Sequence, residues 1–189
     1  LAITFGVMGV INMAHGEMMM VGAYITSFSY YAGLPEAFAI LLGGIGAGLV
    51  GIAVERLIIR RFYGQLLGSL VATWGLSLIM SQGAFLLFGP LVRSVPTPFG
   101  SFAVGDLSFS YYRLFMFAMS LVLVVAVWAL FTFTRFGLRA RATMEDPAMA
   151  RALGVEVGRV YALTFGLGTA LAGVAGGLLA LTSTIGPFY

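Results

Sequence analysis

The chain of 189 residues is 60% hydrophobic and 9% charged, with a mean hydropathy of +1.03, ten arginines and no lysine. Soluble domains carry about 25% charged residues, so this composition identifies a membrane protein. Without a lysine the chain cannot form a G-x-x-x-x-G-K-[ST] phosphate loop. One histidine and no cysteine argue against a metal site or thiol chemistry. We therefore expect no metal and no cofactor bound by this chain.

The uncharged intervals predict five membrane spans. The length of each uncharged interval is close to or beyond the roughly 17 to 25 residues that cross a hydrocarbon core. The expected spans are 17–33, 36–60, 66–89, 113–134 and 159–183. The predicted fold class is all-α, a polytopic transmembrane helical bundle of about five to six membrane segments. Residues 1–189 form a single transmembrane domain, which we expect to be a fragment of a longer permease because an apolar run lies close to its last residue, Tyr189.

The arginines predict the orientation of the spans, because cytoplasmic loops are enriched in basic residues. Eight of the ten fall in two clusters, at 56–61 and 135–159. They flank apolar spans rather than forming one basic face, so we expect no nucleic-acid partner. Residues 90–113 are predicted to form an irregular external loop, marked by Pro90, Pro96, Pro98 and Gly100. We interpret Glu55, beside Arg56, as part of a surface ion pair.

The first 33 residues do not form one simple span. An apolar stretch reaches Ile11, the polar segment 12–17 interrupts it, and a second apolar stretch follows. This pattern predicts a broken or re-entrant helix pair with Gly16 as its permissive residue, and such interruptions mark binding sites in transporters. The alternative is that His15 and Glu17 only cap a helix at the membrane interface.

A polar face and two ridges of small residues stand out in the later spans. Thr73, Ser77 and Ser81 recur every four residues and share one helix face. We expect this face and the interruption to border a translocation path. The candidate path residues are Asn12, His15, Gly16, Glu17, Thr73, Ser77 and Ser81. The ridges predict close helix packing; they consist of Gly168, Ala172 and Gly176, and of Thr169, Gly173 and Gly177.

The predicted cytoplasmic segment at about 135–158 contains a short helix. Asp146 fits its N-cap, Pro147 its first position and Gly154 the residue that ends it. Met149 and Leu153 lie on one side of this helix together with Ala152. An exposed apolar face on so short a helix needs a partner, which is either the membrane surface or another protein.

Four blocks of sequence, taken in order, resemble the inner-membrane permease subunit of branched-chain amino-acid ABC importers over essentially the whole chain. The blocks are Phe5-Gly6-Val7-Met8-Gly9-Val10-Ile11-Asn12-Met13-Ala14-His15-Gly16-Glu17, Ala72-Thr73-Trp74-Gly75-Leu76-Ser77-Leu78, Arg135-Phe136-Gly137-Leu138-Arg139-Ala140-Arg141-Ala142, and Leu153-Gly154-Val155 followed by Ala162-Leu163-Thr164-Phe165. Three further segments look closer to the urea and short-amide branch of this family. They are Ala72-Thr73-Trp74-Gly75, Phe62-Tyr63-Gly64 and Thr184-Ile185-Gly186-Pro187.

The resemblance implies a transport subunit in a bacterial-type plasma (inner) membrane rather than an enzyme. Its implied partners are a second homologous permease, two cytoplasmic ATPase subunits that carry the ATP, an extracytoplasmic substrate-binding protein and the lipid bilayer. The implied coupling helix consists of Pro147, Ala148, Met149, Ala150, Arg151, Ala152 and Leu153, ended by Gly154. The sequence departs from the family here, because Ala148-Met149-Ala150 stands where many ABC importers have Glu-Ala-Ala.

Two other classes of function stay open at this stage. An ion-coupled secondary transporter or channel could use Glu17 or Glu55 as an ion site, since acids inside membranes are commonly functional. An intramembrane enzyme could use His15 and Glu17 as a base pair, although the sequence offers no convincing nucleophile near them.

Overall fold

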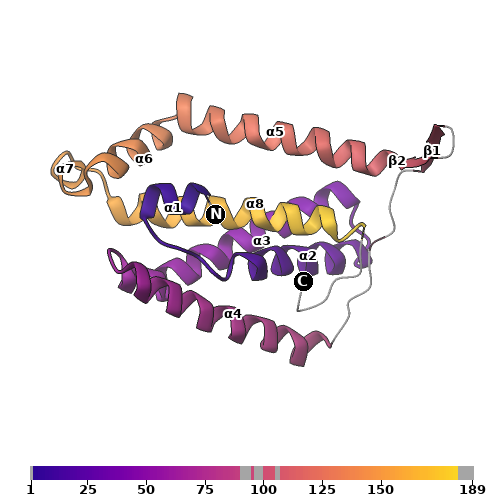
Figure 1. The fold of residues 1–189 in the computed structure, drawn as a ribbon, viewed down its shortest axis with the longest axis horizontal. Coiled ribbons are helices and arrows are strands. Elements are labelled where there is room, and N and C mark those ends of the chain that lie inside the picture. The colour runs from indigo at the N-terminus through magenta and orange to yellow at the C-terminus, as the bar shows by residue number, and fades with distance from the viewer. Residues whose placement is uncertain (1, 90–94, 96–99, 105–106, 183–189) are drawn as a thin grey trace.

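A computed structural model describes residues 2–89, 95, 100–104 and 107–182. The protein is a helical bundle, which confirms the predicted fold class (Figure 1). The elements in chain order are α1 (Ala2–Met8), α2 (His15–Tyr31), α3 (Glu36–Leu57), the 3-10 turn η1 (Ile59–Phe62), α4 (Leu66–Phe88), β1 (Ser101–Val104), β2 (Leu107–Ser110), α5 (Tyr111–Phe133), α6 (Arg135–Glu145), α7 (Pro147–Ala152) and α8 (Val157–Leu179).

Four of the described helices, α3, α4, α5 and α8, are long and apolar enough to cross a membrane. The first residue of each predicted span lies within two residues of the first residue of an observed helix. The first span differs, because α2 has 17 residues and stands at the lower limit for crossing a bilayer. The polar interruption explains its length, since α2 begins only at His15. Together α1 and α2 form the broken segment that the sequence predicts.

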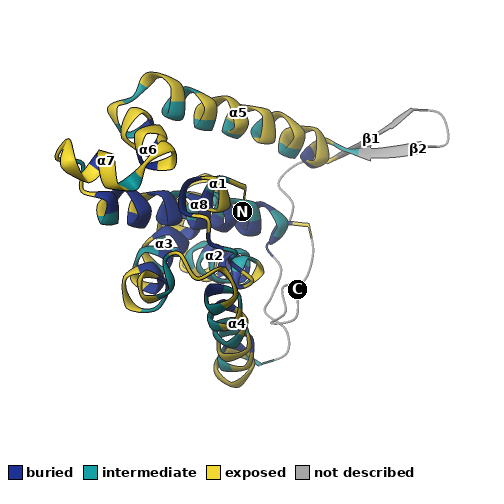
Figure 2. Ribbon diagram, turned by 60° about the vertical axis from the view of Figure 1, so that its left-hand side comes forward, coloured by how far each residue is buried: buried dark blue, intermediate teal, exposed yellow. Residues whose placement is uncertain are grey.

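The core is built on α8, which packs against α3 and α2 and carries more buried residues than any other described helix (Figures 1 and 2). Backbones approach closely where the predicted ridges of small residues lie. A Cβ added at Gly173 would lie 2.8 Å from the Gly43 carbonyl oxygen and 3.2 Å from the Gly44 Cα. A Cβ added at Gly22 would meet the backbone of Gly173 from the other side. The ridges on α8 are therefore the seam that joins three helices.

The helix α5 stands apart from this core (Figure 1). In its most apolar 18-residue window no residue is buried. At its first turn the Tyr112 hydroxyl donates a hydrogen bond of 2.6 Å to the carbonyl oxygen of Leu178, and at its end Phe131 packs against Phe136 of α6. Between these points its apolar side chains need lipid or another membrane helix as their surroundings.

The predicted irregular loop at 90–113 is partly wrong, because the segment contains a β-hairpin. The strands β1 and β2 pair antiparallel, with Ser101 opposite Ser110 and Phe102 opposite Phe109. Phenylalanine and valine favour strands, a signal that the prolines and glycines obscured. Gly100 precedes β1, whereas Pro90, Pro96 and Pro98 lie outside the described residues.

Both arginine clusters lie at the same end of the bundle, as the alternating orientation of the spans requires. Arg56 and Arg60, from α3 and η1, line one pocket with Arg151 and Arg159, from α7 and α8. The β-hairpin lies near the opposite end (Figure 1). We call the first end the arginine end and expect it to face the cytoplasm.

Candidate functional site

The break between α1 and α2 lies three residues earlier in the chain than the sequence indicated. Helix α1 ends at Met8, and Gly9 turns the chain with a φ of +63°. Residues 9–14 are not helical, although the segment 9–11 is apolar. The side chain of Asn12 is buried, and its Oδ1 accepts a hydrogen bond of 3.0 Å from the Ala14 N–H. The break is therefore an ordered turn inside the protein.

Helix α4 supplies hydrogen bonds to the backbone of this turn. Thr73 is fully buried, and its Oγ1 accepts a hydrogen bond of 3.1 Å from the Met13 N–H. The same oxygen lies 3.3 Å from the Ile11 carbonyl oxygen. Irregular backbone within a membrane protein persists only where such groups satisfy it. The first hydroxyl on this face of α4, that of Thr73, therefore stabilises the backbone of the break.

One helical turn further along α4, the same face meets Glu17. The Glu17 Oε1 accepts hydrogen bonds from the hydroxyls of Ser77 and Ser81, the second at 3.3 Å. Its Oε2 is buried and has no hydrogen-bond partner among the described residues. The cap position of α2 is held by Ala14, without a side-chain hydrogen bond. Glu17 therefore points toward α4 instead of capping its own helix.

The structure brings together the two polar motifs that the sequence singled out separately. Asn12 and His15 lie in or beside the break, and Glu17 connects it to the serines of α4. These residues form one polar lining between α2 and α4. That this lining borders a translocation path stays a prediction.

The prediction that Gly16 is the permissive residue of the break is wrong. Gly16 lies in the first turn of α2, and the left-handed backbone conformation is at Gly9 instead. A Cβ added at either glycine would meet nothing within 4 Å. The two positions therefore differ in backbone conformation, whereas each has room for a side chain.

We expect Gly9→Val to lower the melting temperature of the full-length protein in detergent, with Gly16→Val as the matched control. A left-handed conformation costs an L-residue about 1 to 2 kcal/mol, whereas valine in a helix costs no more than the glycine it replaces. Equal melting temperatures for the two variants would show that the break does not depend on the conformation of Gly9.

The prediction that Glu55 forms a surface ion pair with Arg56 is also wrong. Glu55 is only 1% exposed, and its Oε1 accepts a hydrogen bond from the Tyr63 hydroxyl. The ring of Tyr63 packs edge-on against Tyr161 of α8, with centroids 4.9 Å apart. Burial and the hydrogen bond to Glu55 raise the pKa of Tyr63, so the phenol stays a donor. The turn at η1 causes this arrangement, because it folds Tyr63 back over the end of α3.

The short helix α7 begins at the predicted residue, Pro147, and ends at Ala152, one residue before the predicted end. The Asp146 Oδ1 accepts hydrogen bonds from the N–H groups of Ala148 and Met149, at 2.8 and 3.0 Å. At the other end Gly154 has a φ of +83°, and the Val155 N–H donates to the Ala150 carbonyl oxygen at 2.9 Å. This is the Schellman arrangement that glycine favours. Both ends of α7 are therefore fixed by local hydrogen bonds.

The apolar side of α7 faces away from the protein. Met149 is 58% and Leu153 76% exposed, and Ala152 is exposed beside them, whereas Ala150 is buried against the bundle. Pro147, Ala148 and Arg151 line a groove of about 450 Å³ together with Tyr63 and Tyr161. A helix that the sequence did not predict, α6, leads from α5 to α7.

A membrane-spanning bundle with a polar lining at a broken helix and a short apolar helix exposed at one end has the organisation of a permease. Comparison with known proteins agrees: the chain belongs to the family described as "Branched-chain amino acid transport system / permease component", which matches residues 1–189.

Individual relatives cover nearly the whole chain. It is 29% identical over 94% of its length to the high-affinity branched-chain amino acid transport system permease protein BraD of Pseudomonas aeruginosa. It is 30% identical over 98% of its length to the permease protein LivH of Salmonella typhimurium, and 30% identical over 99% to the probable LivH of Methanocaldococcus jannaschii. The chain spans 62 to 63% of the length of these relatives. No solved structure matches it.

Proposed function

We propose that the protein containing this chain is the transmembrane permease of an ABC importer. The observation that carries the proposal is α7, an ordered helix whose apolar residues Met149 and Leu153 are exposed at the arginine end. An apolar face of this size, fixed at both ends and set among arginines, is suited to a groove on a soluble partner subunit. We assign it to an ATPase.

The proposed complex contains two permeases, two cytoplasmic ATPase subunits and an extracytoplasmic substrate-binding protein in the inner membrane. ATP binds to the ATPases, and their closure moves α7 and opens the path to alternate sides. The proposed path residues are the polar lining between α2 and α4. They are Asn12, His15, Gly16, Glu17, Thr73, Ser77 and Ser81.

We propose branched-chain amino acids as the substrate, because the names of the relatives state that substrate. The Glu17 Oε2, which has no partner among the described residues, is suited to an ammonium group. Urea and short amides are the alternative substrates, supported by the resemblance of Ala72–Gly75 and Phe62–Gly64 to that branch. The third segment that resembles the urea and short-amide branch, Thr184–Pro187, lies outside the described residues.

The test is uptake by the full-length protein, reconstituted in proteoliposomes with its partner subunits. We expect uptake of radiolabelled leucine to require ATP and to persist when ionophores dissipate ion gradients. Uptake without ATP that ionophores abolish would identify an ion-coupled transporter and overturn the proposal. ATP-dependent uptake of urea without leucine would keep the importer and replace the substrate.

A further inference from the structure

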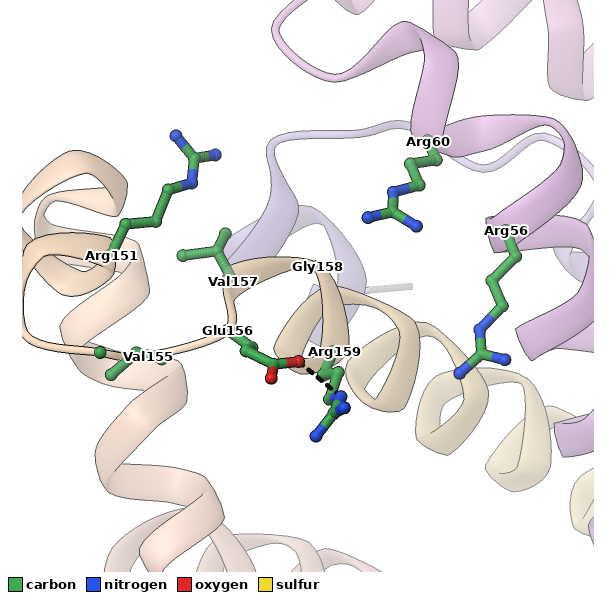
Figure 3. Close-up of a pocket in the computed structure, with 9 residues that line it drawn as sticks. Arg56, Arg60, Arg151, Val155, Glu156, Val157, Gly158 and Arg159 are labelled. Atoms are coloured by element: carbon green, nitrogen blue, oxygen red, sulfur yellow. Dashed lines mark ion pairs between the residues drawn. The ribbon is translucent and has the colours of Figure 1, made fainter.

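A pocket of about 680 Å³ at the arginine end collects side chains from four elements (Figure 3). Arg56 comes from the last turn of α3, Arg60 from η1, Arg151 from α7 and Arg159 from the first turn of α8. The sequence places these residues up to 103 positions apart and does not suggest one basic face. The fold creates this concentration of positive charge.

Most of this charge is not neutralised within the described part of the chain. Arg159 pairs with Glu156 at 2.5 Å, and both side chains are largely exposed. Arg56, Arg60 and Arg151 have no described ion pair. Arg60 reaches over the start of α8, where a Cβ added at Gly158 would lie 3.0 Å from its Nη2 (Figure 3). Among the residues that line the pocket, Glu156 is the one carboxylate beside four guanidinium groups.

The pocket lies where membrane spans end, beside apolar side chains that no described residue covers. Leu57 follows Arg56 at the end of α3 and is 64% exposed, and Leu163 lies one turn into α8 from Arg159 and is 53% exposed. A ligand that fits these surroundings has an anionic head and apolar chains. Basic pockets between membrane helices bind the head groups of anionic lipids in this way.

We propose that this pocket binds the phosphate group of an anionic phospholipid from the adjacent leaflet. Guanidinium groups donate paired hydrogen bonds to phosphate oxygens. The three arginines without a described ion pair come from three separate elements, which the lipid would hold together. The lipid therefore connects the end of α3 and the turn η1 to α7. This proposal does not depend on import or on a particular substrate.

The test uses full-length protein in detergent, with binding of phosphatidylglycerol and phosphatidylcholine measured by native mass spectrometry. We expect the wild type to bind phosphatidylglycerol preferentially. In the double variant Arg56→Gln, Arg60→Gln the affinity for phosphatidylglycerol should fall about thirtyfold, since two basic residues near an anionic lipid contribute about 1 kcal/mol each and about 1.4 kcal/mol is a factor of ten. The control Arg139→Gln, Arg141→Gln removes the same charge from exposed positions on α6 and should bind as the wild type does.

Three results would overturn the proposal. The first is an equal loss in both double variants, which would mean that net charge alone attracts the lipid. The second is stabilisation of the protein by inorganic phosphate without preference for phosphatidylglycerol, which would assign the pocket to a soluble anion. The third is unchanged lipid binding by the pocket variant together with loss of a co-purifying ATPase, which would make the pocket a protein interface.

Discussion

Replacing Met149 with aspartate is expected to abolish ligand-stimulated ATP hydrolysis by the reconstituted complex, if α7 docks on an ATPase as proposed. Met149 is 58% exposed on α7 and is not among the buried residues of that helix. Burying a charged carboxylate in a partner's apolar groove costs several kcal/mol, enough to release the proposed ATPase. The membrane spans should fold normally, because α7 lies outside them.

The variant Gly154→Val acts on the same helix through its end and should have the same effect. Gly154 holds a φ of +83° that a β-branched residue resists. Loss of this conformation removes the hydrogen bond from Val155 to Ala150 and lets the last turn of α7 open. The apolar face would then no longer be presented in one orientation.

The measurements are ATPase co-purification and ATP hydrolysis with and without the substrate-loaded binding protein. The control is Met144→Asp, because Met144 is an exposed methionine on α6. The coupling role would be refuted by normal ligand-stimulated hydrolysis in both α7 variants. If Met149→Asp weakened only the attachment of this segment to vesicles, α7 would be a membrane-surface helix.

The second large effect is expected from Gly173→Ala, which should lower the melting temperature of the bundle and its monodisperse yield in detergent. The added Cβ would lie 2.8 Å from the Gly43 carbonyl oxygen and would also meet the Cβ of Ala47. Backbone atoms cannot rotate away, so α3 and α8 must separate. Overpacking typically costs about 1 to 3 kcal/mol and occasionally more, of which the helix preference of alanine over glycine offsets about 1 kcal/mol.

The matched control is Gly75→Ala in α4, where an added Cβ meets nothing within 4 Å. We expect its melting temperature and monodisperse yield in detergent to equal or exceed those of the wild type. If Gly173→Ala gave the same values, the seam between α3 and α8 would be more plastic than its backbone contacts indicate.

Features that depend on local sequence could be predicted from it. Span boundaries follow from uncharged intervals, the ends of α7 from Asp146 and Gly154, and the packing seam from glycines at four-residue spacing. The polar face of α4 was also visible, because Thr73, Ser77 and Ser81 are spaced by whole helical turns. Each signal lies within one helix or at its end.

Features that depend on contacts between distant segments could not be predicted. The Glu55 carboxylate is buried beside Tyr63, which the turn η1 folds back toward the end of α3. No pattern in the sequence predicts that turn. The basic pocket requires α3 and α8 to bring Arg56 and Arg159 to the lining of one cavity. Charges beside apolar spans look alike in sequence whether they are separate surface groups or neighbours in one pocket.

The short connection between α7 and α8 has a consequence for how motion spreads. Residues 153–156 form a short connection that cannot lengthen freely, because its first residues are hydrogen-bonded to α7 and its last residue to α8. The 23 residues of α8 form a rod about 34 Å long, and its glycines touch α2 backbone to backbone at Gly22 and Met19. A tilt imposed at α7 is therefore delivered as displacement of α2, and with it of the carboxylate of Glu17, without being absorbed by flexible side chains.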